Sequence, residues 1–218
     1  MALFADRRAA GRELSKSLAP WRDVDAVVLG IPRGGVVVAA EVAAILALPL
    51  DAVIVRKLGA DGREEFAVGA IAEGVRIVTS SAVRWAGMRP EDVDRVEATE
   101  RDELARRTDA FAPGDDDLSG RIAIVIDDGV ATGATAIAAC RSVRARKPDR
   151  VVLAVPVAPS NWRAPHDAVD EYVCPHRMRE FWAVGEFYDD FTQTEDAEVV
   201  ALLRNAPTGR ATGEDRGS

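Results

Sequence analysis

A short segment in the second half of the chain combines residue types that suit the binding of a phosphate group. The apolar run Ile122 to Ile126 leads directly into the sequence Asp127-Asp128-Gly129-Val130-Ala131-Thr132-Gly133-Ala134-Thr135. Its two glycines allow the backbone to approach an anion closely, and its two threonines add hydroxyl donors. A helix predicted to begin at Ala134 would aim free amide groups and the positive end of its dipole at the same anion. Residues 129–135 are therefore the candidate phosphate loop.

The two adjacent carboxylates before this loop need a partner that offsets their charge. Placing Asp127 beside Asp128 at the end of a strand costs free energy unless something compensates for their repulsion. Vicinal ribose hydroxyls can donate hydrogen bonds to these carboxylates, and Mg²⁺ can neutralise them, directly or through water. The segment thus matches ribose 5-phosphate, with the phosphate at one end and the diol at the other. Asp127 and Asp128 are the candidate metal ligands.

This pattern resembles the motif with which type I phosphoribosyltransferases bind 5-phosphoribosyl 1-diphosphate (PRPP). Neither the Gly-Lys-Thr/Ser of a Walker loop nor the GxGxxG of a dinucleotide-binding turn is present in the segment. The resemblance implies an enzyme that transfers the phosphoribosyl group of PRPP to a nitrogenous base or amine, releases diphosphate and uses Mg²⁺. It also implies that Asp127 and Asp128 are catalytic, holding the ribose hydroxyls beside an oxocarbenium-like transition state. Residues 129–135 would hold the 5′-phosphate.

A second glycine-rich loop resembles the pyrophosphate loop of the same family. It reads Gly30-Ile31-Pro32-Arg33-Gly34-Gly35 and follows an apolar run. Gly34 and Gly35 can turn amide groups toward the diphosphate, and Arg33 can grip it. Family members often carry a non-proline cis peptide here, and the resemblance implies only that such a bond, if present in this chain, lies near Pro32 to Gly34. The alternative is a glycine-rich turn with a surface arginine.

The resemblance extends to two more segments between these loops. Arg56 and Lys57 follow an apolar run and resemble the Arg-Lys pair that some family members place near the diphosphate. We count both residues among the candidate catalytic residues. The alternative is that they form the solvated basic end of a strand. The stretch Gly59 to Phe66 resembles the flexible loop that closes over the reaction. Within it, Glu64 and Glu65 would either reach the site or remain solvent-exposed charges.

The segment that would hold the acceptor is rich in aromatic residues. It contains Ala183-Val184-Gly185 and Tyr188-Asp189-Asp190-Phe191, which resemble an uncharacterised subgroup of phosphoribosyltransferase-like proteins. Family members use a variable hood in this region, and aromatic faces suit stacking on a base. The alternative is that these rings pack in the core or in a lid. We interpret Cys174 and His176 as structural residues.

Two positions bear on the identity of the acceptor. Enzymes for 6-oxopurines carry an aspartate within the phosphate loop, where this chain has Ala131, and a lysine where it has Ala134. The resemblance therefore argues against hypoxanthine or guanine as the acceptor. It leaves other bases and non-purine amines open.

The loops must be positioned by a sheet whose strands end at one edge. Two βαβ units are predicted, with strands at 24–29, 50–55, 122–126 and 151–157 and helices at 36–47 and 134–146. Apolar strands separated by helices indicate an α/β fold with a parallel sheet of about five strands flanked by helices, as in type I phosphoribosyltransferases. Ligands of such sheets bind beyond the carboxyl ends of the strands. We also predict a loop at 58–70, an antiparallel excursion at 71–78 and a charged structural helix at 90–111.

The domain organisation follows from the same pattern. We expect one phosphoribosyltransferase domain at residues 1–205, with a core at about 21–160. A small hood subdomain would come from about 161–192, with the N-terminus as a further candidate, and residues 206–218 would form a flexible tail. The family resemblance favours a homodimer.

Composition restricts the class of protein further. The chain has 218 residues and a net charge of −8, which disfavours nucleic acid as a partner. No uncharged apolar run approaches the roughly 18 residues of a membrane span, and the charged N-terminus is not a signal peptide. Cys140 and Cys174 have no CxxC spacing. A cytoplasmic protein is expected.

Three hypotheses about function remain. The first is a catalytic phosphoribosyltransferase, and the second is a non-catalytic regulator that senses PRPP or a nucleotide on the same fold. The third is an unrelated α/β phosphate-binding enzyme, such as a phosphatase or a dehydrogenase, for which the chain lacks supporting motifs.

Overall fold

The centre of the molecule is a five-stranded parallel sheet. The computed structural model describes residues 2–60, 63–111 and 118–206. The sheet order is β2-β1-β6-β7-β9, and every neighbouring pair is parallel. The strands are β1 (Ala26–Gly30), β2 (Leu50–Ala52), β6 (Ile122–Ile126), β7 (Arg150–Ala154) and β9 (Glu171–Val173). The predicted α/β fold is confirmed.

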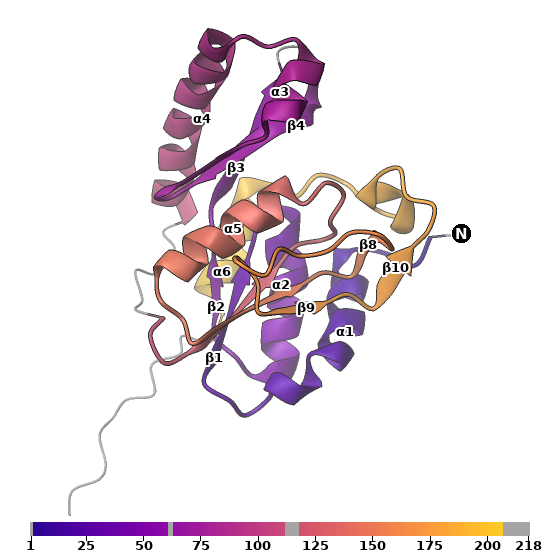
Figure 1. Ribbon diagram of the computed structural model, residues 1–218. Coiled ribbons are helices and arrows are strands. Elements are labelled where there is room, and N and C mark those ends of the chain that lie inside the picture. The colour runs from indigo at the N-terminus through magenta and orange to yellow at the C-terminus, as the bar shows by residue number, and fades with distance from the viewer. Residues whose placement is uncertain (1, 61–62, 112–117, 207–218) are drawn as a thin grey trace, which may run out of the picture.

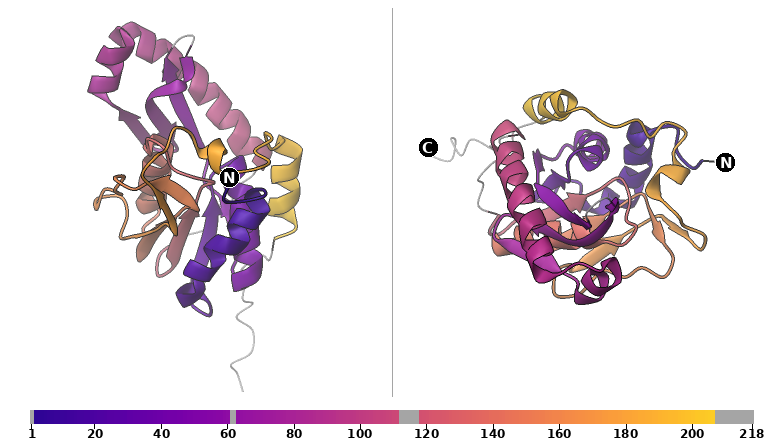
Figure 2. Two further views of the ribbon diagram at one scale, coloured as in Figure 1. Left: turned by 90° about the vertical axis from the view of Figure 1, so that its right-hand side faces the viewer. Right: turned by 90° about the horizontal axis from the view of Figure 1, so that it is seen from above.

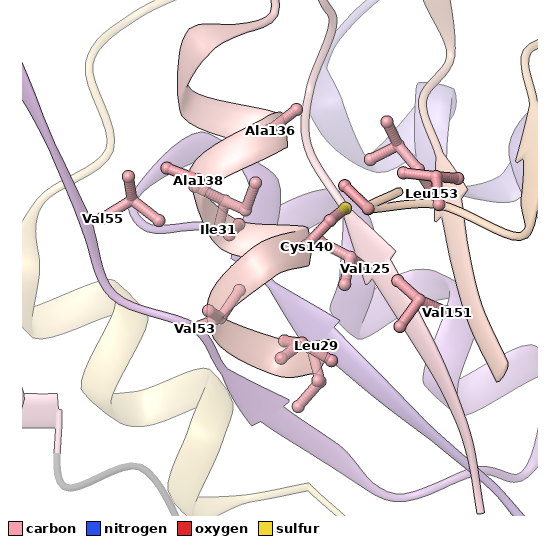
Figure 3. Packing of buried hydrophobic residues seen from close by; sticks show 14 of the residues in the cluster. Leu29, Ile31, Val53, Val55, Val125, Ala136, Ala138, Cys140, Val151 and Leu153 are labelled. Atoms are coloured by element: carbon pink, nitrogen blue, oxygen red, sulfur yellow. The ribbon is translucent and has the colours of Figure 1, made fainter. Parts of the chain in front are cut away.

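Helices cover both faces of this sheet, as Figure 1 shows. Helices α1 (Arg7–Ser17) and α2 (Gly34–Leu46) pack on one face, and α5 (Ala134–Ala145) packs on the other. Alternate residues of β6 serve the two layers: Val125 joins the cluster under α5, whereas Ile124 and Ile126 join the cluster under α2. Figure 3 shows part of the first cluster, where Val125 and Leu153 lie beside Cys140 of α5. Burial on both faces explains why the strands are apolar throughout.

A second, antiparallel sheet projects from the first. It is formed by β3 (Val55–Ala60), β4 (Arg63–Ala72) and β5 (Val75–Val78), and α3 (Ser80–Ala86) and α4 (Pro90–Phe111) accompany it. Figure 2 shows this lobe standing beyond the end of the parallel sheet. The predicted antiparallel excursion at 71–78 is confirmed. Ala72 pairs with Val75, so the chain turns at Glu73-Gly74.

The predicted loop at 58–70 was wrong, because most of this range belongs to the β3–β4 ribbon. Leu58 pairs with Gly69, and Lys57 pairs with Ala70. Gly69 weakened the strand pattern in the sequence. It is required here because a Cβ atom would clash with the Ile77 carbonyl oxygen on β5. The candidate closing loop overlaps the end of this ribbon: residues 61–62 and the Glu64 and Glu65 side chains lie outside what the structure describes.

Helix α4 has the predicted bounds and a structural role. Its apolar face buries Val93, Leu104 and Phe111. Two i,i+4 ion pairs form along the helix, Glu97 with Arg101 and Glu103 with Arg107. The helix contacts β3 and also α6 (Asp196–Arg204) near the end of the chain.

The segment expected to form the hood lies beside the N-terminus. It includes β10 (His176–Met178) and η2 (Val184–Phe187), and β10 pairs with β8 (Val157–Pro159) just before it. The Phe4 amide donates to the Phe187 carbonyl at 3.0 Å, and the Asp189 amide donates to the Phe4 carbonyl at 2.8 Å. Within the described ranges, no helix has the length and apolar character that crossing a membrane requires.

Candidate active site

The two glycine-rich loops predicted from the sequence meet at the carboxyl ends of neighbouring strands. Strand β1 pairs with β6 so that Gly30 lies opposite Ile126, and the Ile31 amide donates to the Ile126 carbonyl at 2.9 Å. A Cβ atom on Gly35 would lie 2.7 Å from that carbonyl oxygen and 2.9 Å from the Cα atom of Asp127. Glycine is therefore needed where the first loop turns into α2 against the acidic pair. The predicted diphosphate loop and phosphate loop therefore contact each other at one edge of the sheet.

The first loop contains a cis peptide between Pro32 and Arg33. This bond lies within the range, Pro32 to Gly34, that the family resemblance indicated. Helix α2 begins at the next residue, Gly34.

The phosphate loop presents a run of unpaired amide groups. The Val130 amide is held by the Val157 carbonyl at 3.1 Å, and the first hydrogen bond of α5 runs from Ile137 to Gly133. Among the described residues, we find no acceptor for the amide groups between these two points, residues 131–136. Ala131 and Thr132 are exposed, so a ligand can reach the loop. This arrangement suits an anion at the N-terminus of α5.

The twin acids lie side by side in a site that shields them from water. The Asp128 amide donates to the Asp127 carboxylate at 2.9 Å, and the Asp128 side chain is 16% exposed. Burial raises the pKa of both carboxyls, and the charge of Asp128 raises the pKa of Asp127 further. Arg7 and Lys57 act in the opposite direction on both pKa values. The protein therefore compensates only part of the charge, which leaves a role for a ligand or an ion.

Arg7 is a site residue that the sequence did not identify. Its Nε atom pairs with Asp128 Oδ2 at 2.8 Å, and its Nη1 donates to the Thr192 carbonyl at 2.8 Å. The guanidinium carbon lies 3.9 Å from the centre of the Phe191 ring, and the side chain is 11% exposed. Asp6 accepts from the Ala9 amide at 2.7 Å, an N-cap that could have indicated helix α1. No sequence pattern indicated a contact across 121 positions.

The aromatic residues near the end of the chain pack mainly against each other and the N-terminal segment. The Tyr188 hydroxyl donates to the Asp128 carbonyl at 2.5 Å, and its ring lies 5.0 Å from Phe191. His176 packs edge-on against Phe4, and the Cys174 thiol donates to the His176 carbonyl, in line with structural roles. Trp182 differs from the others because it is 88% exposed.

The predicted cations divide into two groups. Lys57 lies close enough to lower the pKa of both twin acids. Arg56 instead pairs with Glu100 of α4 at 2.6 Å, and Arg33 contacts Asp196 of α6 at 3.5 Å. Successive residues of a strand point to opposite faces, so Arg56 and Lys57 cannot both face the acids from β3. Within the described residues, Arg7 contacts Asp128 directly, and the charge of Lys57 acts on both twin acids.

The donors present could hold a magnesium ion only together with other oxygen atoms. Within the described ranges, no three His, Cys, Asp or Glu residues gather into a metal-binding group. Mg²⁺ prefers six oxygen ligands and commonly keeps water and substrate phosphate among them. Asp127 and Asp128 fit such a site if substrate oxygens and water complete it.

Replacing Asp127 with asparagine should stabilise the ligand-free protein. The asparagine side chain keeps the oxygen that accepts the Asp128 amide but removes a buried charge. Because burial raises the Asp127 pKa above its unfolded value, wild-type stability falls as pH rises through that interval. At pH 8 we expect Tm to rise by about 2–4 °C, or about 1 kcal/mol. The gain should fade toward pH 4. Thermal unfolding without ligand across this range measures the change, and a pH-independent or negative effect would contradict the prediction.

Replacing Arg7 with alanine should destabilise the protein more than replacing its neighbour. Arg7→Ala leaves Asp128 buried without its partner, at a cost of about 2–4 kcal/mol. Arg8→Ala removes ion pairs to Glu41 and Glu198 that are exposed, and should cost less than about 1 kcal/mol. Urea unfolding at pH 7 measures both free energies. Equal losses would show that Arg7 does not compensate Asp128.

Comparison with known proteins agrees with this geometry. The family model for the phosphoribosyl transferase domain matches residues 7–192. Two Mycobacterium tuberculosis proteins, provisionally named phosphoribosyl transferases, are 49% identical over 210 residues, which is 94% of this chain and 47% of theirs. The crystal structure of TT1426 from Thermus thermophilus is 42% identical with a TM-score of 0.73, covering 93% of this chain and 98% of that one.

The chain therefore spans about half the length of the curated relatives it matches. The motif geometry and the family match together exclude the third hypothesis, an unrelated phosphate-binding enzyme. The chain belongs to the phosphoribosyl transferase domain family.

Proposed function

We propose that the protein transfers the 5-phosphoribosyl group of PRPP to a nitrogenous acceptor and releases diphosphate. The observation that carries this proposal is the arrangement of one loop, in which two partly compensated carboxylates precede amides 131–136, for which the described part of the chain supplies no acceptor. The loop thus offers donors for a phosphate and, one turn away, acceptors for hydroxyl groups. Family membership supports the same substrate.

The reaction forms one bond to the ribose C1 atom and breaks another. The bond from C1 to the diphosphate oxygen breaks, its electron pair leaves with the diphosphate, and the acceptor nitrogen forms the new bond. Positive charge develops on the ribose ring between these events. The chain must hold the sugar, stabilise that charge and neutralise the leaving group.

Each part of the site has a role in this scheme. Amides of the phosphate loop hold the 5′-phosphate, and the carboxylates of Asp127 and Asp128 accept from the ribose hydroxyls and face the developing charge. Gly34 and Gly35 turn the first loop toward the diphosphate, with Lys57 as the nearby cation. Bound Mg²⁺ would add charge neutralisation for the diphosphate oxygens.

The acceptor is proposed to be something other than a 6-oxopurine. Ala131 is exposed on the phosphate loop and offers no carboxylate to a purine nitrogen, and Ala134 offers no ammonium group. The proposal also includes a homodimer, supported by the family resemblance, and a cytoplasmic location, supported by the sequence pattern described above.

A PRPP or nucleotide sensor is the second candidate, and one observation favours it. The guanidinium groups of Arg33 and Arg56 pair with Asp196 and Glu100 instead of remaining free to bind the diphosphate. A site with fewer free cations binds the substrate but activates the leaving group less.

Mg-PRPP should bind to the wild type and not to the variant with both Asp127→Asn and Asp128→Asn. The variant retains oxygen atoms but loses the charges that compensate the metal and the developing cation. We expect affinity to fall at least about 100-fold in isothermal titration calorimetry. The control, Asp102→Asn with Asp109→Asn, makes the same charge change on the exposed side of α4 and should bind normally.

Three outcomes of this experiment decide between the candidates. No binding by the wild type contradicts both the enzyme and the sensor. Binding followed by diphosphate release with one member of a panel of bases and amines supports the enzyme. Binding without release across that panel supports the sensor.

Lys57→Ala should weaken Mg-PRPP binding more than Arg56→Ala does. Lys57 lies near the twin acids, whereas Arg56 is occupied by Glu100. Loss of a charged contact to the diphosphate costs about 1.5–3 kcal/mol, or roughly 10- to 100-fold in Kd. Arg56→Ala should change Kd by less than about 3-fold. Calorimetry that gives the reverse order would assign the diphosphate contact to Arg56.

A further inference from the structure

Trp162 contacts the phosphate loop from a distant part of the chain. It lies between β8 and β9, and its indole Nε1–H donates to the Thr132 carbonyl at 3.1 Å. A Cβ atom on Gly133 would lie 2.5 Å from the same indole nitrogen, so the ring is packed directly against the loop. The tryptophan therefore touches the 132–133 peptide on one side.

This hydrogen bond determines where the neighbouring amide points. In the described chain, the only cis peptide joins Pro32 to Arg33, so the 132–133 peptide is trans. The carbonyl and amide of a trans peptide point in opposite directions. With the Thr132 carbonyl on the indole, the Gly133 amide points away from Trp162. Gly133 is buried, and among the described residues no acceptor is found for its amide.

The dihedral angles of Gly133 show that another orientation is available to this peptide. Gly133 has φ 86° and ψ 0°, the values of the third residue of a type II turn. A type I turn follows nearly the same path with its central peptide rotated by about 180°. That rotation would exchange the positions of the Thr132 carbonyl and the Gly133 amide. A carbonyl oxygen would then face the bound anion and repel it.

Trp162 is itself held firmly. Its ring lies 5.0 Å from Tyr172 of β9, edge to face. Its carbonyl accepts from Arg163 Nη1 at 2.8 Å and from Arg177 Nη2 at 2.9 Å. Its amide donates to the Pro159 carbonyl at 3.1 Å. The indole can therefore act as a fixed donor and impose one orientation on the 132–133 peptide.

We propose that Trp162 is a positioning residue that holds the 132–133 peptide with the Gly133 amide toward the 5′-phosphate. This inference rests on the proposed function for the identity of the anion. Trp162 does not contact the substrate itself, because it lies on the opposite side of the peptide. Its contribution should be specific to ligands that carry the 5′-phosphate and absent for ligands of the diphosphate loop.

The test compares Trp162→Phe with the wild type against three ligands in calorimetry. Phenylalanine retains a ring but lacks the N–H donor. We expect Mg-PRPP and ribose 5-phosphate to bind about 3- to 10-fold more weakly, while Mg-diphosphate changes by less than about 2-fold. Trp85→Phe, the same change at an exposed position on α3, should leave all three affinities unchanged. Equal weakening for all three ligands would indicate a general structural role and overturn the inference.

Two further readouts separate this inference from the proposed function. Trp162→His retains a ring N–H and should recover part of the ribose 5-phosphate affinity that Trp162→Phe loses. A ligand-free crystal structure of Trp162→Phe should show the 132–133 peptide rotated or in two orientations. If the wild type binds no ribose 5-phosphate, the proposed function fails, and the peptide orientation still decides the role of Trp162. An unchanged single orientation in the variant would refute that role.

Discussion

Two like charges placed side by side at the end of a buried strand are the constraint on which the site depends. Nothing in the fold of a parallel sheet requires Asp127 and Asp128, and burial raises the pKa of both. The surroundings compensate them incompletely: Arg7 binds one carboxylate, and Lys57 lies near both. Sites that keep such unfavourable charges are usually functional, because a ligand supplies the missing partner. The glycines, the free amides and the position of α1 are arranged around this pair.

Local features could be predicted from the sequence because short-range chemistry determines them. Strand β6 and helix α4 have the predicted bounds, and α5 begins at Ala134 as expected. The glycine loop before α2 was identified from Gly34 and Gly35, whose lack of a side chain permits the contact with the acidic loop. The sequence also predicted that both loops would lie at the same edge of the sheet, because parallel strands place all their carboxyl ends at that edge.

The parts that could not be predicted depend on contacts between distant segments. Strand β4 forms in a stretch whose glycine and charge content favours a loop. Its pairing with β3 and β5 stabilises it. The sequence predicted that Arg33 and Arg56 would be free to bind the diphosphate. In the structure they pair with Asp196 of α6 and Glu100 of α4, which are distant in the sequence. Helix α1 brings Arg7 to Asp128, and composition alone does not distinguish this arginine from Arg8.

The pairing of the N-terminal segment with residues 187–190 has a consequence for biosynthesis. Phe4 exchanges hydrogen bonds with Phe187 and Asp189, and Arg7 reaches Asp128 beside Phe191. A ribosome makes the acidic loop many residues before it makes these partners. The nascent chain can form both glycine loops and pair β1, β2, β6 and β7 before residues 187–191 emerge, but the acidic pair stays incompletely covered until those residues are made. Assembly of the reaction centre therefore waits until synthesis of the domain is nearly complete.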